Sequence, residues 1–268
     1  MIQNICLCIF VIFICPTYLF SQEKVIIEGA IEIGTTNNTS PAEGTIRWSG
    51  TDFEGYNGQR WVSLTGNATI GSVMDVDGNS YTTVRIGNQE WMAENLRVSK
   101  YNDNMTIPEE TDNVAWSELT TGAWCWYNND SNNELIYGKF YNWHAVNTAK
   151  LCPSGWHVAS DEEWTILSDY LGGLPIAGGK MKQAGTVLWQ SPNTGASNES
   201  GFNGLPTGFR NITGVFFNIG LNAYWWTSTE STFNTDWANY RTISNTGENL
   251  SRLSFEKTYG YSVRCIKD

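Results

Sequence analysis

One segment constrains the fold most, because it carries a complete set of local helix signals. Ser160 is followed by Asp161-Glu162-Glu163, which makes a capping box with acidic residues in the first turn. Three apolar residues then recur at helical spacing, namely Trp164, Leu167 and Leu171. Gly172-Gly173 ends this helix, and these glycines, together with Pro175 and Gly178-Gly179, predict a loop beyond it.

The remaining patterns are shorter and mostly extended. A second helix is expected near Gly138–Val146, with Phe140, Trp143 and His144 facing inward. After residue 185, short strands alternate with loops rich in Gly, Asn, Ser and Thr. These strands are expected at Trp225-Trp226, Tyr240–Ile243 and Tyr261–Ile266. Two helices followed by a loop-rich antiparallel sheet predict an α+β domain.

Composition narrows the class of protein. Charged residues make up 16% of the 268 residues, and 27 acidic against 16 basic side chains give a net charge of −11. A duplex nucleic-acid binder usually shows a basic face, and an electrostatic membrane anchor needs clustered Lys and Arg. The chain also has 26 Gly, 13 Trp and 12 Tyr, with 41% hydrophobic residues. This balance favours a compact, loop-rich extracellular protein without a nucleic-acid partner.

The N-terminus predicts export. The apolar run Cys6–Ile14 is followed by Pro16 and is much shorter than the roughly twenty residues of a membrane-spanning helix. Its length fits a secretory signal over residues 1–21, with cleavage near Phe20–Gln22, although a short buried strand is the alternative. Cys15 follows large residues, so lipidation is not expected. We expect no stable membrane insertion after cleavage.

Two further segments follow the signal. Residues 22–66 form a small strand-rich module, with period-two alternation over 25–33 and short strands near 44–48, 53 and 60–64. This module has few apolar groups, so it is expected to form a homo-oligomer or to lean on the next domain. Residues 67–72 are expected to be a linker, and residues 73–268 a single domain. The domain opens with a hairpin turning at Asp77–Asn79, a reading preferred over a calcium loop because the bidentate Glu is missing.

Cysteine and histidine usage suggests no metal or cofactor. Once the signal leaves, Cys125, Cys152 and Cys265 remain, which allows at most one internal disulfide. Cys125 lies between two tryptophans and is interpreted as a small buried hydrophobe, with a reactive or metal-binding thiol as the alternative. His144 and His157 each lie in an apolar stretch, so we expect both side chains to be buried and hydrogen-bonded. The alternative is that they serve as a catalytic base for a nucleophile or as metal ligands.

Several phrases of the main domain together resemble the Fibrobacter succinogenes major paralogous domain, which is widespread in Bacteroidetes and Fibrobacteres. They occur in order at Ile86–Leu96, Tyr137–Trp143, Leu151–Val158 with Glu163-Trp164, Ala177–Lys180, Asn198–Phe202, Trp225–Glu230 and Gly260–Asp268. The resemblance implies a fold similar to C-type-lectin-like domains and to formylglycine-generating enzymes. It also implies export and a disulfide between Cys152 and Cys265. The segment 44–64 resembles, less specifically, strand modules of Bacteroidetes surface and fibre-like proteins.

The resemblance carries no ligand site. Calcium-dependent lectins use Glu-Pro-Asn or Gln-Pro-Asp with a downstream Trp-Asn-Asp, and Trp237-Ala-Asn239 is the nearest approach here. Formylglycine-generating enzymes need two active-site cysteines, whereas the implied disulfide leaves only Cys125. We therefore expect neither chemistry.

Aromatic residues supply the candidate site. Four tryptophans lie in patterned elements and are expected in the core, namely Trp91, Trp143, Trp156 and Trp164. Trp225 and Trp226 are strand neighbours that point to opposite faces, so one is expected to be buried and the other exposed. Sugar or peptide recognition is expected to use eight residues of this region, namely Trp225, Trp226, Glu230, Trp237, Tyr240, Arg241, Arg252 and Tyr259. The alternative is that these rings, with Tyr261, fill the core under long loops.

These observations predict an exported, non-enzymatic binding or adhesion protein that recognises a glycan or a surface protein. It would be secreted, at the cell surface or in the periplasm, and the chain's end at Asp268 after the last strand predicts no C-terminal sorting domain. A structural subunit of a surface or fibre-like assembly is the alternative. A polysaccharide hydrolase is a weaker one, because no local carboxylate signature supports it.

Overall fold

The computed structural model describes residues 41–42, 44–48, 53–56, 61–63 and 69–268. The signal peptide expected over 1–21, the strand expected over 25–33 and the start of the expected linker lie outside the described residues. Within the described part of the chain, no helix is both long and apolar enough to cross a membrane.

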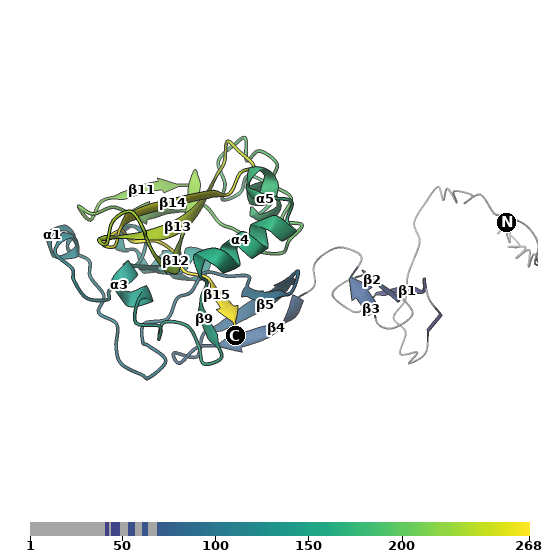
Figure 1. The fold of residues 1–268 in the computed structure, drawn as a ribbon, viewed down its shortest axis with the longest axis horizontal. Coiled ribbons are helices and arrows are strands. Elements are labelled where there is room, and N and C mark those ends of the chain that lie inside the picture. The colour runs from purple at the N-terminus through teal and green to yellow at the C-terminus, as the bar shows by residue number, and fades with distance from the viewer. Residues whose placement is uncertain (1–40, 43, 49–52, 57–60, 64–68) are drawn as a thin grey trace, which may run out of the picture. The chain divides into compact units, whose positions relative to one another are not determined.

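Short strands near the N-terminus form a small antiparallel sheet of their own (Figure 1). β1 (Ile46–Trp48) pairs with β2 (Phe53–Tyr56), and β2 pairs with β3 (Trp61–Ser63). The strands expected near 44–48, 53 and 60–64 are thereby confirmed.

A five-stranded sheet forms one side of the main domain, in the order β4-β5-β6-β15-β9. Its strands are β4 (Thr69–Met74), β5 (Ser80–Ile86), β6 (Gln89–Met92), β15 (Cys265–Lys267) and β9 (Trp156–Val158). The last strand of the chain therefore lies between strands from much earlier in the sequence.

The hairpin between β4 and β5 turns where the sequence predicts. Oδ1 of Asp75 accepts hydrogen bonds from the backbone N–H groups of Asp77 (3.0 Å) and Asn79 (2.9 Å). The Asp75 carboxylate therefore stabilises the turn. The linker expected over 67–72 is wrong from Thr69 onward, because that stretch pairs with β5 and extends the hairpin.

Helix α4 (Asp161–Tyr170) has the predicted ends and the predicted buried face. Ser160 is the N-cap, and the reciprocal hydrogen bonds between Ser160 and Glu163 complete the capping box. The three residues of the predicted apolar stripe are all buried. Gly172 and Gly173 follow with φ of 102° and 95°, a backbone conformation that glycine adopts without strain. Local sequence signals thus determine this helix.

The loop expected beyond α4 is wrong. Residues Leu174–Met181 form helix α5, which has Pro175 in its first turn, where proline is tolerated. Gly178 and Gly179 lie inside this helix because there is no room for side chains. A Cβ built on Gly179 would lie 2.7 Å from the carbonyl oxygen of Gly195. These glycines serve close packing within a helix.

The helix expected over 138–146 is also shorter than predicted. Phe140 and Tyr141 form strand β8, which pairs with β7 (Trp124–Cys125), and helix α3 covers only Trp143–Val146. Asn142 caps α3 through its side chain. Phe140 and Trp143 are buried as expected, whereas His144 is only partly buried. The other short helices are α1 (Asn113–Ser117), η1 (Tyr127–Asn129), η2 (Ser131–Asn133) and α2 (Glu134–Tyr137).

The later strands form two antiparallel sheets. β10 (Thr207–Arg210) pairs with β11 (Phe216–Ile219), and a second sheet has the order β12-β13-β14. Its strands are β12 (Asn222–Glu230), β13 (Trp237–Ser244) and β14 (Ser251–Glu256). The strands expected at 225–226 and 240–243 are confirmed, while the last predicted strand is regular only from Cys265.

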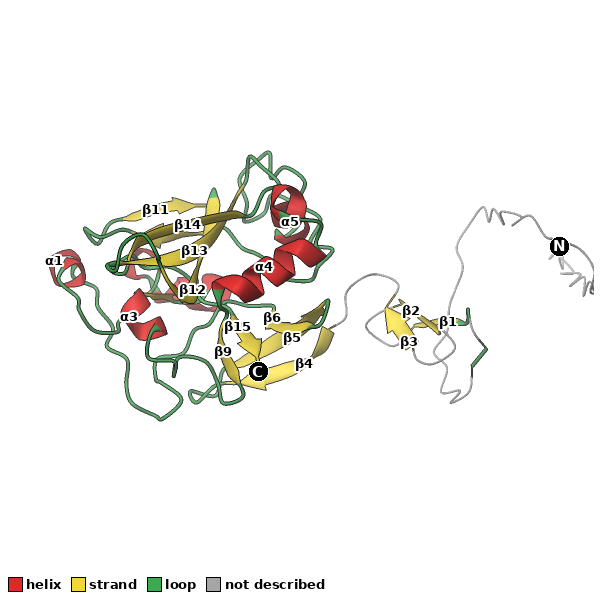
Figure 2. Cartoon of the chain, viewed as in Figure 1, coloured by secondary structure: helices red, strands yellow, loops and turns green. Residues whose placement is uncertain are grey.

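Helix α4 packs between the five-stranded sheet and β12–β13 (Figure 2). Its Trp164 shares one buried cluster with Trp91 of β6 and Trp225 of β12. A second cluster surrounds Trp226 and contains the Cys152–Cys265 disulfide. The disulfide implied by the family resemblance is confirmed, and so is the buried state of Cys125. The domain is of the α+β class, with short helices and antiparallel strands.

Candidate functional site

The expectation that either Trp225 or Trp226 is exposed is wrong, since both are 0% exposed. The Trp225 ring packs 5.7 Å from the ring of Trp164 on one face of β12. The Trp226 ring lies 4.4 Å from Tyr261 on the other face. Each indole N–H donates a buried hydrogen bond, from Trp225 to Asn95 Oδ1 and from Trp226 to the carbonyl of Tyr141. Both faces of β12 are covered, so these rings hold the core together.

The two expected ligand-binding tyrosines also belong largely to the core. Tyr240 is buried against Trp226 and Tyr261, and burial raises its pKa to about 12. Tyr259 is partly buried and stacks on Phe209. Its pKa is likewise raised, mainly by burial. The prediction that Tyr240 contacts a ligand is therefore wrong, because only 7% of the residue is exposed.

Trp237 and Glu230 lie near the ends of the neighbouring strands. Trp237 is partly buried and stacks on Phe255, with ring centroids 5.6 Å apart. Glu230 is exposed, and its carboxylate accepts a hydrogen bond of 2.7 Å from Nζ of Lys257. Lys257 also donates to the carbonyl of Thr235, so this ion pair ties down the loop between β12 and β13. Glu230 is engaged within the protein and does not line the groove described below.

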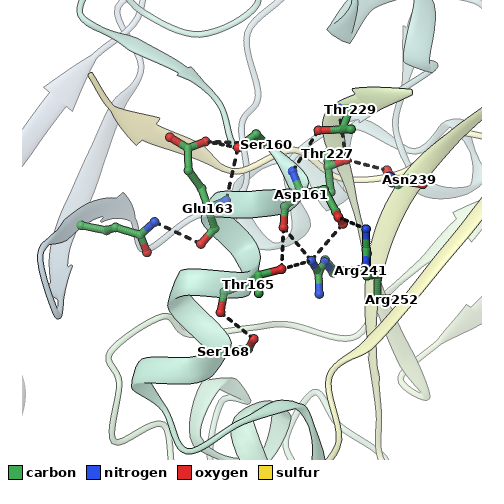
Figure 3. A network of polar contacts seen from close by, with 11 residues as sticks. Ser160, Asp161, Glu163, Thr165, Ser168, Thr227, Thr229, Asn239, Arg241 and Arg252 are labelled. Carbon is green, nitrogen blue, oxygen red and sulfur yellow. Dashed lines mark hydrogen bonds and ion pairs between the residues drawn. The ribbon is translucent and has the colours of Figure 1, made fainter. Parts of the chain in front are cut away.

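The prediction that Arg241 contacts a ligand is also wrong, because its side chain is 0% exposed and cannot reach a ligand at the surface. Its Nη2 donates to Asp161 Oδ1 (2.9 Å), to the Asp161 carbonyl (2.7 Å) and to Thr165 Oγ1 (3.0 Å) (Figure 3). Burial lowers the pKa of Arg241, and the nearby carboxylate of Asp161 opposes that shift. Nε and Nη1 of this guanidinium are buried without a protein partner among the described residues. Arg241 cross-links β13 to the first turn of α4.

Arg252 lies directly opposite Arg241 in the register of β13 and β14, and it reaches the surface. Its side chain is 57% exposed, and Nη2 contacts Asp161 Oδ2 at 2.5 Å. The backbone N–H of Asp161 donates a hydrogen bond to Thr229 Oγ1 (3.0 Å), which fixes the start of α4 against β12 (Figure 3). One buried carboxylate at the start of α4 thus holds two arginines, one internal and one at the surface.

Arg252 lines a groove of about 460 Å³. The groove is bordered by residues of β12, β13, β14 and the loop between β12 and β13, namely Thr229, Thr232, Phe233, Asn239, Arg252, Leu253 and Ser254. Phe233 is 89% exposed, more than the other exposed aromatic rings of the described residues. The remaining lining residues are mostly neutral and can donate or accept hydrogen bonds. The groove therefore offers a flat ring, a guanidinium fork and several hydroxyl and amide groups.

Of the eight expected ligand-binding residues, Arg252 is the one that lines the groove. Sequence reasoning missed Phe233, Asn239 and the buried anchor Asp161. Phe233 carries a readable signal: it is a lone aromatic in the polar stretch 231–235. Asp161 was interpreted only as a helix-capping acid, because its two arginine partners are far away in the sequence.

Both histidines are only partly buried, which differs from the expectation, whereas His157 is hydrogen-bonded as expected. The side chain of His157 is 40% exposed and lies between two carboxylates, with Nε2 2.8 Å from Glu163 Oε1 and Nδ1 2.7 Å from Asp268 Oδ1. Burial disfavours the protonated ring, but these two hydrogen-bonded carboxylates outweigh it and raise the pKa of His157. Burial together with the charge of Lys257 lowers the pKa of His144.

Two other concave regions in the described part of the chain are smaller than this groove. One of about 180 Å³ borders Cys152, His157 and Ser228, and one of about 20 Å³ borders Asn95 and Glu134. Among the described residues, no group of three or more His, Cys, Asp or Glu side chains could hold a metal ion. The groove beside Arg252 is the largest of these three regions and combines a charged group with an exposed ring, so it is taken as the candidate site.

The fold and the groove define an α+β domain with one internal disulfide and a polar, aromatic-bordered surface site. The family model for the Fibrobacter succinogenes major domain matches residues 84–267, and the chain belongs to this family. Comparisons with curated proteins and with solved structures found no match.

Proposed function

We propose that this chain is an exported, non-enzymatic binding or adhesion protein that recognises a glycan or a surface protein. The groove beside Phe233 carries this proposal. A ring that is 89% exposed gives a ligand apolar area to cover, which favours binding, and flat rings with polar neighbours suit sugar or peptide recognition. The groove volume of about 460 Å³ lies within the usual range of small-ligand sites.

Export is supported by the disulfide between Cys152 and Cys265. Disulfides of this kind persist in oxidising compartments such as the periplasm and the cell exterior. The same disulfide, which joins the segment before α4 to the last strand, supports a C-type-lectin-like architecture. We therefore propose that the protein acts at the cell surface or in the extracellular space.

A glycan-array screen of the protein, run with calcium and with chelator, tests the proposal. Selective binding should weaken in Phe233→Ala, because the variant removes an exposed ring without opening the core. Tyr170→Ala is the matched control, since Tyr170 is an exposed aromatic on α4 that does not line the groove. Equal loss in both variants, or binding that neither variant changes, would place the site elsewhere.

Assembly into a surface or fibre-like structure is the second candidate. Ile46 of β1 and Phe53 of β2 expose apolar surface on a sheet of short strands, and such surface favours association. Sizing the protein with and without residues 22–66 tests this role. A monomer in both cases would reject it, and a larger species only in the longer form would support it.

A further inference from the structure

We infer that the groove takes an acidic saccharide, and that Arg252 recognises its carboxylate. This inference rests on the proposed binding function and names the ligand class of the same site. Among the residues that line the groove, Arg252 is the one that carries a formal charge. A cationic groove on a chain with a net charge of −11 indicates a local preference for anions.

Two neighbouring arginines share a single contacting carboxylate among the described residues at this site. Arg241 and Arg252 are cross-strand neighbours, and like charges in that position repel each other. Asp161 is the one carboxylate in contact with either guanidinium in the described structure, through Oδ1 for Arg241 and Oδ2 for Arg252. Two guanidinium groups thus share one contacting carboxylate. A second carboxylate arriving at Arg252 would relieve the repulsion.

Arg252 is exposed enough for a ligand carboxylate to reach it. Its side chain is 57% exposed, while the Asp161 side chain is only 8% exposed. Asp161 therefore contacts Arg252 through Nη2, while more than half of the Arg252 side chain stays open to solvent. A planar guanidinium has five N–H donors and binds a carboxylate through two parallel hydrogen bonds. Asp161 acts here as a positioning residue.

The other lining groups favour a sugar over an acidic peptide. Thr229, Thr232 and Ser254 present hydroxyls and Asn239 an amide, which match the dense donors and acceptors of a sugar ring. Phe233 offers a flat apolar face for the C–H side of such a ring. Leu253 is the one aliphatic lining residue, so the groove has little to bury the apolar side chains of a peptide.

The test compares trigalacturonate with its methyl ester, which keeps the ring and removes the charge. The short ligand limits long-range repulsion by the acidic protein. Binding to the full chain is followed by NMR titration. We expect the ester to bind about tenfold or more weakly, because a charge-assisted hydrogen bond is lost. Arg252→Gln should weaken trigalacturonate by a similar factor and abolish the preference for acid over ester.

Two further variants separate ligand class from general binding. Phe233→Ala should weaken acid and ester by the same factor of roughly two to ten, because the ring interacts with both. Arg85→Gln removes an exposed arginine from β5, outside the groove, and should change neither ligand. Thermal unfolding of each variant confirms that the fold is retained.

The outcomes distinguish this inference from the proposed function. If neutral glycans bind as tightly as acidic ones and Arg252→Gln has no effect, the acidic class is wrong while glycan binding stands. If triglutamate binds as tightly as trigalacturonate, the groove recognises negative charge alone, and the assignment of a saccharide ligand is wrong. If no glycan of any charge binds, both the inference and glycan recognition at this groove fail.

Discussion

The buried carboxylate of Asp161 should contribute far more to stability than any exposed carboxylate of the domain. Its side chain is 8% exposed and contacts Arg241, which is fully buried. Asp161→Asn keeps the side-chain size and one hydrogen-bond acceptor but removes the charge. Arg241 would then be a buried cation without a contacting counter-ion, and two of its nitrogens already lack protein partners among the described residues.

The expected cost follows from this geometry. Removing one partner of a buried ion pair costs about 3–5 kcal/mol. In a domain of this size class each kcal/mol lowers Tm by about 2–4 °C, so Asp161→Asn should lower Tm by roughly 6–20 °C. Equilibrium urea unfolding with the disulfide intact measures the free energy, and thermal unfolding followed by circular dichroism measures Tm.

Glu230→Gln is the matched control, because Glu230 pairs with Lys257 and its side chain is 55% exposed. An exposed pair is worth about 0–1 kcal/mol, so this variant should unfold nearly as the parent does. The double variant Asp161→Asn/Arg241→Met removes both buried charges and should recover much of the loss. Equal costs for Asp161→Asn and Glu230→Gln, or strict additivity in the double variant, would refute the reasoning.

Three other predictions concern the disulfide, the free thiol and titration. Replacing Cys152 and Cys265 by Ser should cost about 4–5 kcal/mol by the chain-entropy relation for a loop of 113 residues, measured by urea unfolding; a cost below about 1 kcal/mol would contradict it. Burial raises the pKa of Cys125 to about 12, so the native protein should not react with a thiol reagent at neutral pH, and labelling without prior unfolding would show the thiol to be accessible. The raised pKa of His157 means that its protonated ring stabilises the fold. That contribution should be complete below its ordinary pKa of 6.5 and be lost as pH rises through the higher folded-state value, and a His157→Gln variant with the same pH dependence of Tm would disprove this origin.

Close packing supplies one more test. Gly179→Ala should destabilise the domain by about 1–3 kcal/mol, although alanine is the better helix former by about 1 kcal/mol. The added methyl would meet the backbone carbonyl of Gly195, which cannot move without disturbing its loop. A stabilised variant in urea unfolding would mean that the helix has more room than the structure gives it.

The fold could be predicted where the controlling contacts are short-range. The capping box and the glycine stop of α4 involve residues within a few positions of one another, so these ends are correct. Helix α5 was missed because Gly178 and Gly179 disfavour a helix locally. Their presence is explained by the backbone of Gly195 and Asn249, which lies against them from distant parts of the chain.

The candidate site shows the same division. Alternation along a strand places Trp225 and Trp226 on opposite faces, and this part of the prediction holds in the register of β12. Alternation does not say whether both faces are covered. Helix α4 covers one face and Tyr261 the other, so neither ring is free. The sequence predicts Arg252 and Arg241 as ligand-binding residues alike and cannot tell which one is exposed. Exposure is a property of the assembled sheet.

By itself, the sequence determined the α+β class, the capped helix and the short late strands, because turn chemistry and side-chain periodicity act over neighbouring residues. The family resemblance added the Cys152–Cys265 pairing. Only the tertiary structure decided which aromatic and charged side chains reach solvent. Phe233 and Arg252 are exposed, while Trp226 and Arg241 are buried, because packing between distant elements removes water from some surfaces of a strand and leaves others open.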